Sequence, residues 1–325
     1  MTGSTLIVSE VRTETPLIRR LRLVHPQGQA LAPLASGAHL QLTVPGVPER
    51  RCYSIVHLSP AQALDPQPGA YWIAVRLEEP SRGGSAWMHR LKVGDAVTVG
   101  EPRNEFALHA AAPGEAPAVL LAGGIGITPI ASHAAALRAQ QRPFVLHYSS
   151  RSREHFALLG ELQALCGDDL HLHTDDDAAT RLDLGALLDG CHPSQPLYVC
   201  GPKGMIDVAI AAASARGWAK AHIHIELFVE AATQQGDGAF EVELRQSGQV
   251  LQVPADKTIL EVLEAAGCDP MFDCRRGECG VCQASVIEGT PDHRDYFLSD
   301  SERASGKLIQ TCISRAKTAR LVLDL

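Results

Sequence analysis

The chain has 325 residues, of which 45% are hydrophobic and 20% are charged, and its net charge is −8. This length favours two or three domains over a single core, and the composition is that of an ordinary globular protein. The acidic balance argues against nucleic acid as a partner. The longest apolar region, residues 116–136, is broken by glycines and prolines, which argues against a membrane span.

Residues 1–110 predict a domain made of short strands. The segments 20–24, 39–44 and 71–77 alternate or run apolar, and clusters of glycine and proline separate them. Many strands without long helices favour a closed antiparallel barrel.

Two motifs stand out in this first domain. Arg51-Cys52-Tyr53-Ser54 ends a predicted strand, and Gly83-Gly84-Ser85 is a glycine turn that opens a short helix. Free amides at a helix start, after glycines that allow close approach, can bind a phosphate, and Arg51 can add a charge-assisted hydrogen bond. The simpler interpretation is a tyrosine at a strand end and an unrelated glycine turn.

Residues 111–230 change to alternating strands and helices. Strands are predicted at 118–122, 144–147, 170–173, 197–200 and 222–228, with helices through residue 138 and around 156–166 and 203–216. This order predicts a parallel sheet with helices on its faces. His171, His173, His222 and His224 alternate along two strands, which indicates a polar face more than a metal site.

Two loops follow strands of this sheet. The first, Gly123-Gly124-Ile125-Gly126-Ile127-Thr128-Pro129, is of the kind that binds a dinucleotide pyrophosphate, although its spacing is not the Rossmann G-x-G-x-x-G. The second, Cys200-Gly201-Pro202-Lys203-Gly204-Met205, ends the last core strand. Taken alone, Cys200 reads as a small buried hydrophobic residue at a strand end.

Residues 231–238 are small and polar and predict a linker, and residues 239–325 predict a third domain. A hairpin at 240–245 and 250–253 precedes a helix at 258–266, which begins near Asp256 or Thr258. The expected order is that of a β-grasp ferredoxin.

Four cysteines in this last domain carry the strongest pattern. Cys274, Cys279 and Cys282 have the spacing C-x4-C-x2-C, and Cys312 follows at a distance, as in plant-type [2Fe–2S] proteins. Gly277 and Gly280 let the loop wrap around a cluster. A zinc site would show two C-x2-C pairs, a disulfide cage suits a short secreted chain, and unrelated buried thiols would not keep this register. The other five cysteines have no framework spacing and no secretory leader opens the chain, so we expect a cytoplasmic protein.

The motifs in this order resemble those of the phthalate dioxygenase reductase family, which includes vanillate demethylase reductases. The resemblance implies a multidomain fold: an antiparallel β-barrel flavin domain at 1–110, an α/β parallel-sheet NAD(P) domain at 111–230, a linker at 231–238 and a β-grasp ferredoxin domain at 239–325. It implies FMN and a [2Fe–2S] cluster as cofactors. NADH is the implied coenzyme, although Arg151 and Arg153 after the second strand leave NADPH as the alternative.

The resemblance also assigns residues to the cofactors. It places Arg51 and Gly83-Gly84-Ser85 at the flavin phosphate, Tyr53 on the flavin ring and Ser54 near its reactive nitrogen N5. The nucleotide is expected at Gly123, Gly124, Gly126, Thr128, Gly201 and Pro202. Cys200 is expected beside the nicotinamide, and Glu226 and Phe228 against the flavin, although Phe228 alone would also suit a core. The cluster ligands are Cys274, Cys279, Cys282 and Cys312.

The implied function is that of a reductase component, which passes electrons from NADH through FMN and the cluster to a separate terminal Rieske-type oxygenase acting on an aromatic or similar small compound. The alternative is a ferredoxin-like carrier or redox sensor without NADH oxidoreductase activity. Arg275 and Arg276 put two positive charges in the cluster loop. Three interpretations are open: they raise the potential of the cluster, they mark the face that docks the partner or, most simply, they are solvated surface residues.

Overall fold

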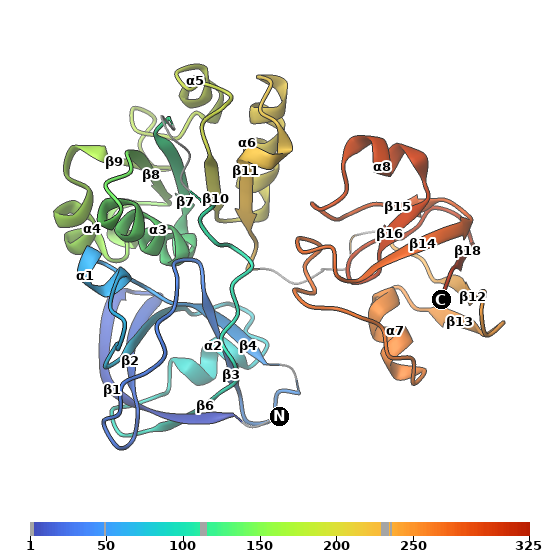
Figure 1. Cartoon of the computed structure of the whole chain (residues 1–325), viewed down its shortest axis with the longest axis horizontal. Coiled ribbons are helices and arrows are strands. Elements are labelled where there is room, and N and C mark those ends of the chain that lie inside the picture. The colour runs from blue at the N-terminus through green and yellow to red at the C-terminus, as the bar shows by residue number, and fades with distance from the viewer. Residues whose placement is uncertain (1–2, 49, 111–115, 229–233, 235) are drawn as a thin grey trace. The chain divides into compact units, whose positions relative to one another are not determined.

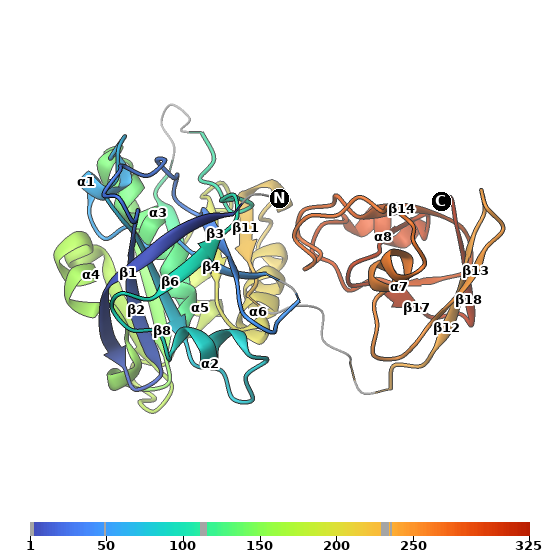
Figure 2. The ribbon, with the colours of Figure 1, turned by 90° about the horizontal axis from the view of Figure 1, so that it is seen from below.

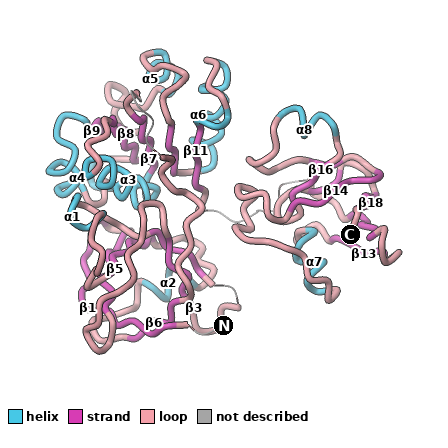
Figure 3. The backbone as a smooth tube through the Cα atoms, in the orientation of Figure 1, coloured by secondary structure: helices cyan, strands magenta, loops and turns pink. Residues whose placement is uncertain are grey.

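The computed structural model describes residues 3–48, 50–110, 116–228, 234 and 236–325. These residues form two compact units, 1–226 and 227–325, which are described separately. Figure 1 shows the elements of both, and Figure 3 shows how strands and helices are distributed along the chain.

The first sheet of the N-terminal unit is an antiparallel barrel of six strands in the order β4-β3-β6-β1-β2-β5. A bridge between Ile55 and Ile73 brings the two edge strands together and closes it. Its interior is filled by alternate apolar side chains, among them Leu21, Leu40 and Leu42, all fully buried. The elements are β1 (Ser4–Thr15), β2 (Ile18–Val24), β3 (His39–Thr43), β4 (Arg51–Ser54), α1 (Pro60–Ala63), β5 (Tyr71–Arg76), α2 (Gly84–Met88) and β6 (Ala96–Val99).

The second sheet is parallel throughout, in the order β11-β10-β7-β8-β9. The packed helix pairs α3–α4 and α5–α6 flank it, as Figures 1 and 2 show. Its strands are β7 (Ala118–Gly123), β8 (Phe144–Ser150), β9 (Leu170–Thr174), β10 (Leu197–Cys200) and β11 (Ile223–Glu226). Its helices are η1 (Gly124–Gly126), α3 (Ile127–Ala139), η2 (Arg153–His155), α4 (Leu159–Cys166), η3 (Gly167–Asp169), α5 (Leu184–Asp189), α6 (Lys203–Ala215) and η4 (Lys220–His222).

One apolar cluster joins the barrel to the parallel sheet. Ile18 and Val56 of the barrel pack in the same cluster as Leu120 and Ile130 of the sheet and its first helix. Ser132 on α3 adds two hydrogen bonds across the junction, donating to the Ile55 carbonyl at 2.6 Å and accepting from the His57 N–H at 2.9 Å. Barrel and sheet are therefore packed as one body.

The C-terminal unit is a mixed five-stranded sheet in the order β13-β12-β18-β14-β16, covered by α7. Strands β12 and β18 run parallel, and the other pairs are antiparallel. Thr258 begins α7 through a capping box with Glu261. The elements are β12 (Phe240–Leu244), β13 (Val250–Val253), α7 (Ile259–Ala265), β14 (Gln283–Glu288), β15 (Pro291–Asp292), α8 (Asp300–Ser305), β16 (Leu308–Gln310), β17 (Arg315–Ala316) and β18 (Arg320–Leu323).

The predicted fold class is confirmed, with an antiparallel barrel, a parallel sheet and a ferredoxin-type domain in that order. The predicted strand at 222–228 is shorter than expected, because η4 occupies its start and β11 ends at Glu226. Residues 231–233 and 235 of the predicted linker, and the predicted boundaries at 110/111 and 230/231, fall wholly or partly outside the described residues, so the domain limits stay predictions. No helix among the described residues is long and apolar enough to cross a bilayer.

Candidate functional site

The predicted flavin motif lies on β4, at the closing edge of the barrel. Strand β4 pairs with β3 so that Tyr53 faces Leu40 in register and Arg51 faces Leu42. Tyr53 is half-buried against the barrel core, and burial raises the pKa of its hydroxyl. Ser54 is 4% exposed, and its hydroxyl has no hydrogen-bond partner within the part of the chain that the structure describes. A buried hydroxyl in this state fits a polar atom of a bound ring.

The glycine turn lies directly on this strand, although thirty residues separate the two in sequence. Gly83 has φ +92°, a conformation that favours glycine, and it begins α2. A Cβ on Gly84 would lie 2.9 Å from Cγ of Arg51, so the arginine side chain runs along a surface that only glycine leaves open. The structure therefore brings Arg51 and the Gly83-Gly84-Ser85 turn together, as an anion site requires.

Ser81 is a residue that the sequence analysis missed. Its hydroxyl accepts hydrogen bonds from the N–H groups of Gly83 and Ala86, both at 3.2 Å, and it lies 3.0 Å from the hydroxyl of Ser85. An acceptor oxygen thus occupies the position in which a phosphate oxygen would bind these amides. The signal was a serine two residues before a glycine turn at a helix start.

The two predicted nucleotide loops meet at one point of the parallel sheet. Strands β7 and β10 are neighbours, and the chain proceeds outward from them in opposite directions, to β8 on one side and β11 on the other. Ligands of open parallel sheets bind beyond the carboxyl ends of the strands at such a switch point. Gly123 ends β7 and Cys200 ends β10, so both loops start there.

Glycines allow these loops to touch. A Cβ on Gly126 would lie 2.1 Å from the carbonyl oxygen of Cys200, and one on Gly123 would lie 2.7 Å from Cδ of Pro202. Gly201 in turn is packed against Gly123. By contrast, Gly124 has φ +55° and open space around it. The loops therefore form one surface of closely packed backbone, with Gly124 as its open position.

Four further predicted residues are placed as follows. Thr128 is 1% exposed and its hydroxyl donates to the Ile125 carbonyl at 3.0 Å. Cys200 is wholly buried and pairs in register with Glu226, which is 2% exposed. Phe228 is 37% exposed, so it is not a core residue. The roles of these side chains at a coenzyme or flavin stay predictions.

The strand histidines pack against one another. Nδ1 of His147 lies 3.0 Å from Nε2 of His173, and the rings of His147 and His171 stack with centroids 4.9 Å apart. His224 stacks on Tyr198. Burial lowers the pKa of His147 and of His224 to about 4. These contacts describe neutral, stacked imidazoles.

The four predicted cluster cysteines converge in the C-terminal unit. The Cys279 and Cys312 thiols hydrogen-bond the sulfur of Cys274, and Cys312 also bonds that of Cys282. The bond from Cys312 lowers the pKa of Cys282 to about 7, and the one from Cys279 lowers the pKa of Cys274. The Arg276 N–H points at Cys274 Sγ at 3.3 Å. Hydrogen bonding to Cys274 in turn raises the pKa of Cys279 and that of Cys312. Four neighbouring thiols, with backbone amides turned to sulfur, fit an iron–sulfur cluster.

No three histidine, cysteine or acidic side chains among the described residues are arranged around one metal ion. Neighbouring residues leave no room for a Cβ at the two loop glycines. Gly277 (φ +78°) meets Asp295, and Gly280 (φ +79°) meets the ring of Phe297.

The arginines of the cluster loop differ from the expectation of a solvated surface. Arg276 is 8% exposed and its Nε lies 3.3 Å from Glu278 Oε2, so this arginine is buried in an ion pair. Arg275 pairs with Glu264 and lies over the ring of Phe272 at 4.0 Å. The surface interpretation is therefore wrong for Arg276, because the loop folds this charge inward onto Glu278.

A search for related proteins agrees with this organisation. Residues 242–317 match the family model of the 2Fe-2S iron-sulfur cluster binding domain. The chain is 40% identical to the vanillate O-demethylase oxidoreductase of Pseudomonas sp. (strain HR199 / DSM 7063), over 98% of this chain and 99% of that protein.

Two of the similar solved structures each cover 99% of the chain. The structure of phthalate dioxygenase reductase, described as modular for electron transfer from pyridine nucleotides to [2Fe-2S], has a TM-score of 0.69 and 36% identity over 99% of this chain and 98% of that one. An intact type IV self-sufficient cytochrome P450 monooxygenase has a TM-score of 0.73 and 33% identity over 99% of this chain, which spans 41% of that protein. At these identities and coverages, the chain belongs to the phthalate dioxygenase reductase family of NAD(P)H-dependent flavin and iron–sulfur oxidoreductases.

Proposed function

We propose that this protein is the reductase component of an oxygenase system, which passes electrons from NADH through FMN and a [2Fe–2S] cluster to a separate terminal oxygenase of the Rieske type. The partner's substrate is an aromatic or similar small compound. The observation that carries the proposal is the pairing of all four nucleotide and flavin motifs within one packed unit, followed by four converging sulfurs in the next. We place the protein in the cytoplasm, without nucleic acid or membrane partners.

In this proposal, residues of the chain bind the flavin and the coenzyme and orient them. Arg51 and the Gly83-Gly84-Ser85 turn hold the flavin phosphate, Tyr53 lies along the ring and the buried Ser54 hydroxyl meets N5. Gly123, Gly124, Gly126, Thr128, Gly201 and Pro202 hold the coenzyme, with Cys200 beside the nicotinamide and Glu226 and Phe228 toward the flavin. A bound flavin supplies the conversion between two-electron and one-electron transfer, and the protein supplies position.

The test of the enzyme is an anaerobic titration of the purified protein with NADH, followed by absorbance. We expect both the flavin bands and the iron–sulfur bands to bleach. A ferredoxin-like carrier or sensor would leave them unchanged, and that result would reject the enzymatic function.

The flavin is proposed to be FMN, because one phosphate site is formed by Arg51 and the Gly83 turn, and no segment of the sequence plainly cradles an adenosine. Acid extraction followed by chromatography identifies the flavin. Recovery of FAD would refute this assignment.

NADH is the proposed coenzyme, and the end of β8 supports it. Arg151 and Arg153 follow β8, but the N–H groups of Asp175 and Asp176 bond to the carbonyls of Ser150 and Arg151 at 3.0 and 3.2 Å. These acidic residues therefore lie at the same sheet edge and would oppose a 2′-phosphate. The ratio of kcat/KM for the two coenzymes decides, and a tenfold preference for NADPH, about 1.4 kcal/mol, would overturn the assignment.

The docking face for the oxygenase is proposed to be apolar. The side chains of Arg276 and Glu278 are each 9% exposed in their ion pair, whereas Met271 (78% exposed), Phe272, Val281 and Phe297 are exposed in or beside the cluster loop. Exposed methionine and aromatic side chains are typical of the centres of protein interfaces. Met271→Glu should therefore lower NADH-driven turnover of the oxygenase and leave ferricyanide reduction unchanged. Ile287→Glu, at the other end of β14, is the matched control, and equal effects of the two variants would reject this face.

The type of oxygenase is settled by reconstitution. Purified Rieske-type and haem-containing oxygenases are each supplied with this protein and NADH, and we expect turnover with a Rieske-type partner. Turnover with haem-containing oxygenases alone would reject the Rieske-type partner and leave only the proposal that the protein is a reductase for an oxygenase.

A further inference from the structure

The cluster loop contains a residue in the left-handed backbone conformation that is not a glycine. Arg275, directly after the ligand Cys274, has φ +55°, whereas the other positive φ values of the loop belong to Gly277 and Gly280. A Cβ makes this conformation costly, so it persists only where the surrounding structure determines it. Backbone strain of this kind gathers at functional sites, and here it lies beside a cluster ligand.

The left-handed turn directs a backbone amide at that ligand. It bends the chain after Cys274 so that the next N–H group, that of Arg276, points back at Cys274 Sγ at 3.3 Å. A negative φ at residue 275 would rotate the following peptide and turn this N–H away from the sulfur. Amide hydrogen bonds to sulfur stabilise the extra negative charge of a reduced cluster, and they therefore raise its reduction potential.

The side chain of Arg275 is held from two sides. Its Nη2 is paired with Oε1 of Glu264, near the end of α7, and its guanidinium lies 4.0 Å from the centre of the Phe272 ring. The two charged side chains are 35% and 33% exposed, so the ion pair is partly shielded from solvent. These contacts fix the arginine side chain and oppose relaxation of its backbone.

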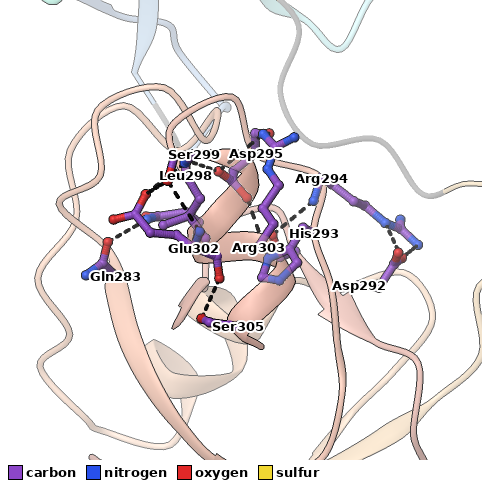
Figure 4. A network of polar contacts seen from close by, with 12 residues as sticks. Gln283, Asp292, His293, Arg294, Asp295, Leu298, Ser299, Glu302, Arg303 and Ser305 are labelled. Carbon is purple, nitrogen blue, oxygen red and sulfur yellow. Dashed lines mark hydrogen bonds and ion pairs between the residues drawn. The ribbon is translucent and has the colours of Figure 1, made fainter. Parts of the chain in front are cut away.

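The rest of the cluster loop is held by the segment that leads into α8. The Tyr296 N–H donates to the Gly277 carbonyl at 2.9 Å. Figure 4 shows how this segment is closed beside α8, where the Asp295 carboxylate accepts from the Leu298 N–H at 2.7 Å. A substitution at Arg275 should therefore change the first turn of the loop without opening the remainder.

We propose that Arg275 is a positioning residue for the [2Fe–2S] cluster. Its left-handed backbone keeps the Arg276 N–H on the Cys274 sulfur and so raises the reduction potential of the cluster. The ion pair with Glu264 and the contact with Phe272 stabilise this backbone conformation. The inference goes beyond the proposed function, because it concerns the potential of the cluster and not the electron donor or acceptor.

The test compares substitutions that share the loss of charge and differ in the backbone that they allow. Arg275→Gly permits a positive φ, whereas the β-branched side chain of Arg275→Val opposes it. The holoprotein is titrated with a chemical reductant and redox mediators, and the EPR signal of the reduced cluster is followed. We expect the equilibrium constant for one-electron reduction to fall roughly tenfold in Arg275→Val, which is about 59 mV. Arg275→Gly should stay within about twofold of the wild type.

The ion pair with Glu264 should have a second, smaller effect. Glu264→Gln should lower the same equilibrium constant by roughly two- to threefold in the wild-type background, because it weakens a partly exposed ion pair, and should add nothing in Arg275→Gly. Arg245→Val is the matched control, since it removes an arginine that is paired with Glu288 in the same unit and lies outside the left-handed region. It should leave the potential unchanged.

A direct effect of the charge would give a different pattern. Equal shifts in Arg275→Gly and Arg275→Val would show that the charge sets the potential, and unchanged potentials in both would show that the amide does not. Either result would overturn the proposal.

If Arg275→Val does not hold a cluster, Arg275→Ala takes its place, and its potential should again lie below that of Arg275→Gly. Equal potentials in those two variants, or loss of the cluster from Arg275→Gly, would also overturn the proposal. The titration does not use NADH, so failure of NADH to bleach the unmodified protein would refute the proposed function and leave this result standing.

Discussion

The nucleotide loop and the cluster loop both depend on glycine, but what presses against the glycines differs. Gly126 faces the backbone of Cys200, which is fixed by the parallel sheet. Gly280 faces the ring of Phe297, a side chain 42% exposed to solvent. A loop held by backbone cannot adjust, whereas a loop held by a side chain can. The coenzyme surface should therefore be rigid, and the cluster loop should tolerate compensated change.

The largest effect is expected from a substitution that removes the cluster from the cysteine loop and leaves the nucleotide loop intact. Cys279→Ser should destroy or weaken the cluster, because one of four thiolates is lost. NADH-dependent reduction of cytochrome c should fall to background, while reduction of ferricyanide, which takes electrons from flavin, should persist. Cys268→Ser, outside the sulfur group, should keep both activities. Equal loss of both in Cys279→Ser would mean that the C-terminal unit needs its cluster to fold and affects the rest.

Gly126→Ala tests the rigidity of the nucleotide loop. The new Cβ would lie 2.1 Å from the Cys200 carbonyl oxygen, so strands β7 and β10 must separate at their ends. We expect a loss of about 3 kcal/mol in stability, at the upper end for overpacking, together with loss of NADH binding. Thermal unfolding and coenzyme titration measure these two effects. Gly160→Ala on α4, where no atom lies within 4 Å, is the control and should be neutral or stabilising.

The loss of stability caused by Gly280→Ala should be smaller than that caused by Gly126→Ala, and a second substitution should partly reverse it. The change meets the Phe297 ring at 2.3 Å and also places alanine at φ +79°, which alone costs about 1–2 kcal/mol. Phe297→Ala should remove the clash and leave only the backbone cost, so the double variant should be more stable than Gly280→Ala. Thermal melts of the cluster absorbance measure the difference. Additive losses in the double variant would contradict a side-chain support.

The smallest expected effect is a difference between the two units in how their stability depends on pH. The histidines whose pKa is lowered by burial, including His133 (to about 3), His147 and His224 (to about 4), all lie in the N-terminal unit. Each is neutral when folded and titrates near 6.5 when unfolded, so stability is complete above pH 6.5 and falls as pH drops toward 4. We expect a loss of about 1–2 kcal/mol between pH 7 and pH 6 for this unit.

Flavin fluorescence follows unfolding of the N-terminal unit, and cluster absorbance follows the other. His133→Gln should flatten the pH dependence of the first signal. An unchanged slope would show that buried histidines do not set the acid limit.

Local patterns predicted the fold classes and the loops. The strand alternation, the glycine turns and the cysteine spacing are short-range signals, and the structure assembles Gly84 on Arg51 and Gly126 on Cys200 as the motifs require. Strand β1, the longest of all, was not singled out, because its residues are largely polar. The sequence patterns also did not predict contacts between residues that are far apart in the chain. Nothing in the sequence of the cluster loop predicts that the side chain of Arg276 is buried against Glu278. Nothing near Asp237 predicts its ion pair with Arg294, which lies 57 residues away.

The order of strands in the C-terminal unit has a consequence for synthesis. Strand β18 is the central strand of its sheet, between β12 and β14, and Cys312 is also late in the chain. The sheet therefore cannot close until Leu323 has left the ribosome, whereas both sheets of the N-terminal unit are complete at Glu226. At typical elongation rates of roughly 5 to 20 residues per second, the 97 residues between 226 and 323 take roughly 5 to 20 s. Newly made chains should pass through a stage in which the flavin and nucleotide unit is folded while the iron–sulfur machinery of the cell still faces open thiols.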